Sequence, residues 1–168
     1  MFFDKMNKEN HQKDTVLSEA ELIQKLETWF AVGSGPFPLS VTGHSMVPFI
    51  LPERDTAFLF PCTGKVKTGD VVLVLTSNGR LLLHRVKKTD GEKLVTAGDA
   101  LGYTDESSAA ADVIAVCRRV ERKGRVYGEK SLYWLFFSEI WIHLLPLRKF
   151  LTGGYAAMKK SAGKLRKE

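Results

Sequence analysis

The stretch DVVLVLTSNGRLLLHRVK, from Asp70 to Lys87, decides the fold class of this chain. Two apolar, β-prone runs flank Ser77-Asn-Gly79, and a short Asn-Gly turn between such runs is a strong signal of a β-hairpin. Successive side chains of a strand point to opposite faces, so His84 and its neighbour Arg85 should face opposite sides. The stretch therefore predicts two antiparallel strands, with His84 on a face that it shares with apolar residues.

Similar short runs lie on both sides of this hairpin, and a second turn signal stands at Thr89-Asp90-Gly91. The further strands are expected at residues 38–42, 56–60, 93–96 and 112–117. No helical pattern alternates with them, which excludes a βαβ rhythm. The sequence predicts a mainly β fold, an antiparallel coiled sheet of barrel type.

One helix is expected before the sheet and one after it. Ser18-Glu-Ala-Glu21 is a capping-box pattern followed by apolar residues at helical spacing, which predicts an amphipathic helix that ends at Gly33. Leu132 to Leu145 is an apolar run of 14 residues, too short for a standard transmembrane helix. Two interpretations of this run stay open: packing on the core, or contact with a membrane in the plane of its surface.

These patterns divide the chain into three parts. Residues 1–36 form a flexible leader and the amphipathic helix, residues 37–127 form the β domain, and residues 128–168 form the apolar helix and a basic tail. From Arg148 onward the tail carries seven Lys and Arg residues against one acidic residue, Glu168. This placement of charge favours peripheral membrane contact through residues 131–168 over a nucleic-acid partner.

The cysteines and the N-terminal residues limit which cell compartment and which cofactor chemistry we expect. Cys62 and Cys117 are too few for a disulfide framework and form no CxxC pair, so we expect no metal and no cofactor. The first 14 residues lack the pattern of a signal peptide. We therefore expect a cytoplasmic or peripheral membrane protein without a standard transmembrane helix.

The sharpest local feature is Thr42-Gly43-His44-Ser45-Met46-Val47-Pro48, a turn-rich segment around one serine. A serine hydroxyl becomes a useful nucleophile only when a base removes its proton, and a neutral histidine such as His84 can do so. Backbone N–H groups around the turn can stabilise the oxyanion of an acyl intermediate, which makes Gly43 and Met46 candidates for oxyanion or substrate binding. The pair Ser45 and His84 predicts nucleophilic catalysis.

Four motifs in this order resemble type I signal peptidases and the related LexA-like serine peptidases. The nucleophile box is Gly43-x-Ser45-Met46-x-Pro48 with Asp55 downstream; the others are Thr68-Gly-Asp70, Leu83-His84-Arg85-Val86 and Ala97-Gly98-Asp99-Ala100. The resemblance covers about residues 39–120. It implies a serine endopeptidase of the Ser–His branch that cleaves leader or signal peptides after small residues. Gly-Asp-Ala stands where the family has Gly-Asp-Asn, and an amphipathic helix stands in place of the family's membrane anchor.

The resemblance also assigns the acidic residues. Asp105 lies six residues beyond Asp99 and would accept the second N–H of the His84 imidazole, with Asp112 as an alternative. Asp99 ranks second and is expected to hold its loop. Two other functions remain open, a LexA-like self-cleaving regulatory module and a catalytically inactive membrane-docking adaptor.

Overall fold

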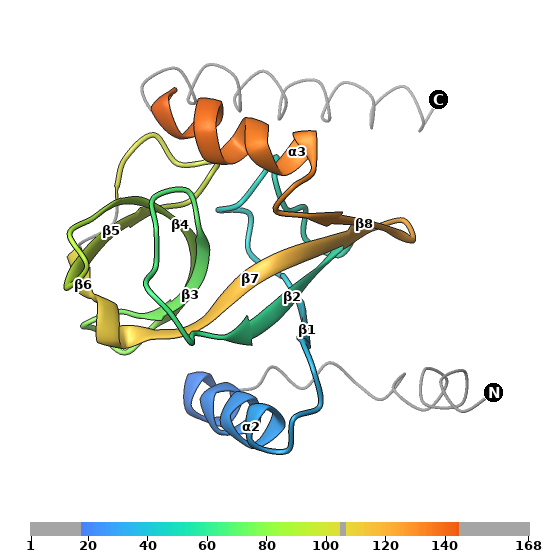
Figure 1. The fold of residues 1–168 in the computed structure, drawn as a ribbon, viewed down its shortest axis with the longest axis vertical. Coiled ribbons are helices and arrows are strands. Elements are labelled where there is room, and N and C mark those ends of the chain that lie inside the picture. Colours follow the sequence, from blue (N-terminus) through green and yellow to red (C-terminus); the bar gives the residue numbers. More distant parts are fainter. Residues whose placement is uncertain (1–17, 105–106, 145–168) are drawn as a thin grey trace, which may run out of the picture.

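The computed structural model describes residues 18–104 and 107–144, and it confirms the mainly β fold. Eight strands form one antiparallel sheet that curls strongly into a half-barrel (Figure 1). The strands are β1 (Phe37–Ser40), β2 (Asp55–Pro61), β3 (Val71–Leu75), β4 (Leu81–Thr89), β5 (Lys93–Ala97), β6 (Ser107–Ala109), β7 (Val113–Arg122) and β8 (Arg125–Gly128). A single turn of 3-10 helix, η1 (Ala110–Asp112), leads from β6 into β7.

The order of the strands in the sheet differs from their order in the chain. The sheet runs β1-β2-β7-β3-β4-β5-β6, with β8 paired to β7. β7 therefore lies between β2 and β3, which follow each other in the sequence. The predicted hairpin is β3–β4, where Val72 pairs with His84 and Val71 with Arg85.

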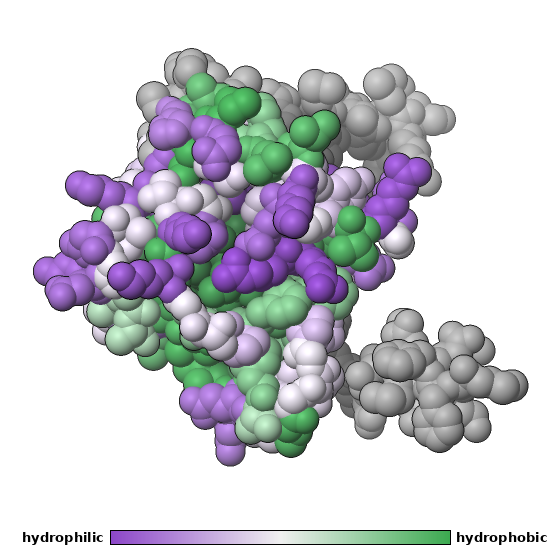
Figure 2. Space-filling model, viewed as in Figure 1, coloured by the Kyte–Doolittle hydropathy of each residue, from purple (hydrophilic) through white to green (hydrophobic). Residues whose placement is uncertain are grey.

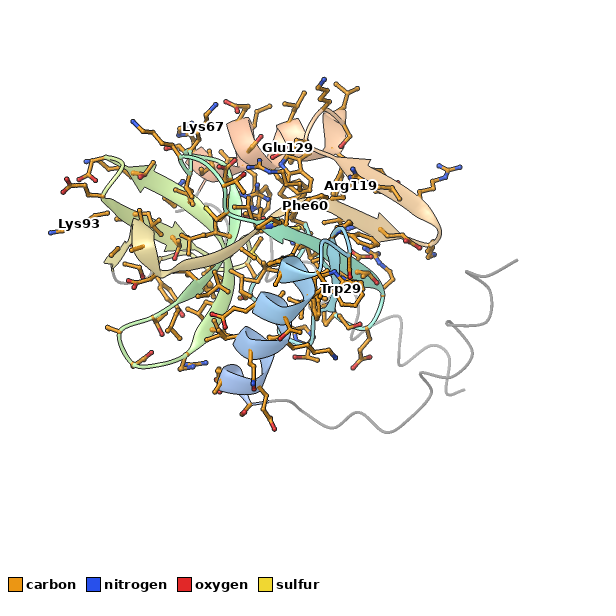
Figure 3. All side chains as sticks on the ribbon, turned by 60° about the horizontal axis from the view of Figure 1, so that its bottom comes forward. Trp29, Phe60, Lys67, Lys93, Arg119 and Glu129 are labelled. Atoms are coloured by element: carbon orange, nitrogen blue, oxygen red, sulfur yellow. The ribbon has the colours of Figure 1, made fainter. Side chains whose placement is uncertain are left out.

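The N-terminal helix, α2 (Glu19–Ala31), is capped as its sequence predicts. The Glu21 N–H donates to the Ser18 hydroxyl oxygen at 3.3 Å, and the Ser18 N–H donates to the Glu21 carboxylate at 2.8 Å, which together form a capping box. Trp29 lies at the end of α2 that meets the sheet (Figure 3), and its indole N–H donates to the Gly35 carbonyl at 3.1 Å. Leu26 is the fully buried residue that anchors α2 on the core.

The C-terminal apolar segment, which we call the helical run, comprises α3 (Leu132–Leu135), the π-helical η2 (Phe136–Ile140) and the 3-10 helix η3 (Trp141–His143). It lies at the opposite end of the molecule from α2 (Figure 1). The Ser138 hydroxyl donates to the carbonyls of Trp134 and Leu135, and such back-bonding distorts regular α-helix. The single helix expected over 132–145 is therefore three short pieces over 132–143, and Leu145 lies outside the described residues.

One face of the helical run packs on the core, which answers part of the question left open by the sequence. Trp134, Phe137 and Trp141 are buried in the larger core cluster, together with Leu26 of α2. The exposed face still carries Leu132, Leu135, Phe136 and Ile140, along with the exposed Glu139 and His143. Figure 2 shows hydrophobic surface at the α3 end of the molecule with hydrophilic residues beside it. Within the described ranges, no helix is long and apolar enough to cross a bilayer.

The two faces of the β3–β4 hairpin border different cores. The larger cluster contains Val71 and Leu73, and the smaller contains Val72, Val74 and Val86. His84 lies opposite Val72, so it belongs to the face of the smaller cluster, while Arg85 lies opposite Val71 and faces the larger one. The alternation predicted from the sequence therefore directs these neighbours to opposite sides of one strand.

Candidate active site

Ser45 lies in the connection between β1 and β2, which we call the Ser45 loop (residues 41–54). Residues 42–44 are exposed and Ser45 itself is half-buried. Directly after it, three apolar side chains anchor the loop in the larger core: Met46, Phe49 and Ile50. Ser45 is therefore at the point where the loop passes from solvent into the core.

Asp55 closes the Ser45 loop. Its buried carboxylate accepts the Leu51 N–H at 2.9 Å and hydrogen bonds from Arg54 and Arg122, and the Asp55 N–H donates back to the Leu51 carbonyl. Burial alone would raise the pKa of this carboxyl. The hydrogen bonds from Arg54, Arg122 and the Leu51 N–H outweigh burial and lower the pKa to about 2. The charged form of Asp55 thus stabilises the loop.

Stability against acid should therefore depend on Asp55. A carboxyl whose folded pKa lies below its unfolded value contributes stability above the unfolded pKa, near 4, and loses it as pH falls toward about 2. Asp55→Asn should lower the free energy of unfolding by about 2 kcal/mol at pH 7, and this deficit should shrink between pH 4 and pH 2. Urea denaturation of wild type and Asp55→Asn between pH 2 and pH 7 measures this difference in the free energy of unfolding. Glu92→Gln, which removes an exposed carboxylate, should show no such trend; a deficit for Asp55→Asn that stays constant would contradict the assignment.

Gly98 brings the end of β5 into direct contact with Ser45. A methyl group at position 98 would lie 2.6 Å from the Ser45 carbonyl oxygen and 2.9 Å from the Ser45 Cβ, so only glycine fits. The Ala100 N–H donates to the same Ser45 carbonyl at 2.7 Å, and the Leu101 N–H donates to the Gly98 carbonyl at 3.0 Å. The Gly98 loop (residues 98–101) is thus packed and hydrogen-bonded against the backbone of Ser45.

The register of β4 and β5 places His84 beside the same contact. Arg85 pairs with Ala97, and continuing this antiparallel register by one residue sets His84 opposite Gly98. Directly opposite residues share a face of the sheet. The imidazole of His84 and the position of the missing Gly98 side chain therefore point to one side, which is the side where Ser45 lies. His84 is 3% exposed, so a reacting group at this position would be shielded from solvent.

Arg85 holds the Gly98 loop from the other face of β4. Its guanidinium donates to the Asp99 carboxylate through Nε at 3.0 Å and through Nη2 at 2.8 Å, and through Nη1 to the Gly69 carbonyl at 2.9 Å. Arg85 and Asp99 are both fully buried. A buried bidentate ion pair fixes the direction of both partners. Asp99 is therefore turned toward Arg85.

Of the predicted site residues, the structure packs Gly98 against Ser45, and the continued register of β4 and β5 sets His84 beside Gly98. Asp105 lies outside the described residues, so its contact with His84 stays a prediction. The Met46 side chain is buried in the core, which leaves only its backbone for oxyanion or substrate binding. Gly43 has no neighbour within 4 Å of where its side chain would be, and the close approach to the Ser45 backbone is made by Gly98.

The Ser45 hydroxyl forms no side-chain hydrogen bond with another described residue. Catalytic hydrogen bonds often tighten only in the complex with substrate.

Cys117 offers no competing nucleophile, because burial raises the pKa of its thiol to about 12. In the described part of the chain, no group of three or more His, Cys, Asp and Glu side chains could hold a metal ion.

Sequence reasoning did not identify four residues that contact the two loops: Arg85, Arg122, Tyr133 and Trp141. For Arg85, the sequence did contain a pattern that could have indicated its contact. An arginine in an apolar strand is buried only with a carboxylate partner, and Asp99 was the acid within reach of the next strand. Tyr133 and Trp141 had no such pattern, because the spacing of aromatic residues in the helical run does not indicate which polar atoms they contact.

No protein-family model, curated protein or solved structure matches this chain. The resemblance of the four motifs to signal peptidases therefore stays a prediction.

Proposed function

We propose that this protein is a serine endopeptidase that cleaves leader or signal-type peptides after small residues, with Ser45 as nucleophile and His84 as general base. The contact between Gly98 and Ser45 carries this proposal. It joins three of the four motifs at one point, because Gly98 packs on the Ser45 backbone and lies opposite His84 in the continued register. Segments far apart in the sequence converge there on the two side chains that acyl transfer needs.

The proposed reaction has two steps. The Ser45 Oγ attacks the carbonyl carbon of the scissile bond while His84 takes the hydroxyl proton, which forms a tetrahedral oxyanion. The intermediate collapses, the C–N bond breaks, and the proton on His84 passes to the leaving amine. A water molecule that gives its proton to His84 then hydrolyses the acyl ester, which releases the new carboxyl end and restores the Ser45 hydroxyl.

A cleavage assay with a residue-matched control tests the proposal. Purified protein is incubated with synthetic leader peptides that have small residues before the intended cut, and mass spectrometry reads the position of cleavage. Wild type and Ser77→Ala, which changes an exposed turn serine, should cleave equally. Ser45→Ala should lose activity by a factor of about 10⁴ or more, because no nucleophile remains.

A second measurement separates chemistry from substrate choice. A fluorophosphonate should add covalently to Ser45, and the intact mass and a peptide map should locate the adduct there. Labelling of Ser45 without peptide cleavage would support Ser45 as the nucleophile but reject leader peptides as the substrate class. Equal cleavage by wild type and Ser45→Ala would reject the proposal, and loss of mass from the chain itself would favour self-cleavage of the LexA-like kind.

Peripheral membrane contact through residues 131–168 is part of the same proposal. The described portion supports it through the exposed Leu132, Phe136 and Ile140, although Glu139 is also exposed on the helical run. The basic residues from Arg148 onward suit an anionic surface. Such contact would bring the enzyme to substrates that emerge from a membrane.

A further inference from the structure

We propose that the helical run is a positioning element of the Ser45 site, in which Tyr133 and Trp141 fix the Ser45 loop and the Gly98 loop relative to each other. This inference rests on the proposed function and concerns residues outside the proposed pair of Ser45 and His84. Each aromatic residue contributes one polar atom to the backbone of one loop, and both belong to a single short helical segment.

Tyr133 holds the Ser45 loop. Its hydroxyl donates to the Phe49 carbonyl at 2.6 Å, with the Pro48 carbonyl at 3.1 Å, and it accepts a hydrogen bond from Arg122 at 2.8 Å. Burial raises the pKa of the Tyr133 phenol, which keeps it protonated and able to donate. Its ring also stacks on Phe49 with 5.4 Å between centroids. Tyr133 thereby fixes the backbone that follows Ser45.

Trp141 holds the Gly98 loop. Its indole N–H donates to the Asp99 carbonyl at 2.9 Å, and Trp141 is buried. The next residue, Ala100, donates its N–H to the Ser45 carbonyl. A hydrogen bond to the Asp99 carbonyl therefore orients the peptide group whose N–H contacts Ser45, because the Asp99 carbonyl and the Ala100 N–H belong to one rigid peptide plane.

The core between the two contacts joins them. Phe49 of the Ser45 loop packs against Trp134 and Phe137 of the helical run, with ring centroids 4.9 Å and 5.1 Å apart. The Arg85 guanidinium lies 4.4 Å from the Phe49 ring centroid while it binds Asp99. A shift of the helical run would therefore move both loops, and a misplacement of about 1 Å can cost about 100-fold in rate.

The test removes one polar atom at a time from the full-length protein. Tyr133→Phe and Trp141→Phe should each lower kcat for leader-peptide cleavage about 10-fold with KM within twofold of wild type, and the double variant about 100-fold. The rate of fluorophosphonate labelling of Ser45 should fall in parallel. Independently of activity, hydrogen exchange at the Ala100 amide should quicken at least 10-fold in Trp141→Phe, because the peptide plane is no longer held.

Two matched controls separate positioning from general loss of stability. Trp29→Phe removes the equivalent indole-to-carbonyl hydrogen bond at α2, and Tyr127→Phe removes a hydroxyl from a ring that contacts Tyr133. Both should keep the wild-type kcat at a temperature where all variants are folded. Values of kcat for Trp141→Phe and Tyr133→Phe within twofold of wild type, or an equal loss in Trp29→Phe, would overturn the inference while the proposed function stands. A wild-type protein inert toward both peptide and fluorophosphonate would overturn the proposed function and this inference with it.

Discussion

The variant His84→Gln is expected to cleave leader peptides with a kcat/KM about 10⁴-fold below that of wild type. Glutamine retains a polar side chain of similar length but cannot take a proton from Ser45, so attack on the carbonyl loses its base. His84 lies on β4 at 3% exposure, opposite Gly98 in the continued register. Steady-state kinetics measures the loss, and a thermal melt by circular dichroism establishes that the variant is folded.

The matched control is His44→Gln, the same change one residue from Ser45 in the sequence. His44 is exposed on the Ser45 loop, and we expect its replacement to change kcat/KM by less than about 10-fold. A large loss in His44→Gln with activity retained in His84→Gln would assign the base to the loop and reject the role of β4. Activity retained in both variants would reject a histidine base altogether.

Arg85→Met is expected to destabilise the fold by about 3–5 kcal/mol, because it leaves the Asp99 carboxylate buried without its partner. Domains of this kind have a total stability of about 5–15 kcal/mol, so a large share would be lost. The loss is measured as the change in the free energy of unfolding by urea denaturation. Removing the second charge as well, in Arg85→Met/Asp99→Asn, should recover part of the loss, since no buried charge then remains unpaired.

Arg118→Met provides the comparison on the surface. Arg118 pairs with Glu129, but both side chains are about two-fifths exposed, and exposed pairs contribute about 0–1 kcal/mol. The two variants lose the same side chain and the same kind of ion pair in different surroundings. If Arg85→Met cost no more than Arg118→Met, the buried pair would not be what holds the Gly98 loop.

Local patterns predicted the elements whose stabilising contacts lie close together in sequence. The capping box at Ser18 and Glu21 marked the start of α2, and the Asn-Gly turn marked the β3–β4 hairpin. β1 begins and ends slightly earlier than expected, at Phe37–Ser40, because it pairs with β2 only over those residues.

Elements without an apolar alternation were missed. β7 continues past Cys117 through charged residues, which belong to a strand because Arg122 binds Asp55 and Arg119 lies over Phe60 on the neighbouring β2 (Figure 3). β6 and β8 are short, and neither shows the apolar alternation that marks a half-buried strand.

The candidate site also has features that the sequence predicted and features that it did not. The places of Ser45 in a loop and of His84 in a strand were predictable, because their local patterns imply a turn and a strand, and their catalytic roles stay predictions. The contact of Gly98 with Ser45 was not predictable, since it follows from the packing of the Ser45 loop against the end of β5. The contacts of Tyr133 and Trp141 depend on a helix geometry that changes from α to π to 3-10 within 12 residues, which no spacing rule anticipates.

The place of β7 in the sheet also sets the order in which a growing chain can assemble the sheet. In the described sheet, β7 joins the half whose two strands flank the Ser45 loop to the half that contains His84. Domains begin to fold from the N-terminus during synthesis, but here the two halves cannot be joined until residues 113–122 have left the ribosome. A nascent chain would carry both reactive side chains without an assembled site, so the proposed peptidase would remain latent for most of its own synthesis.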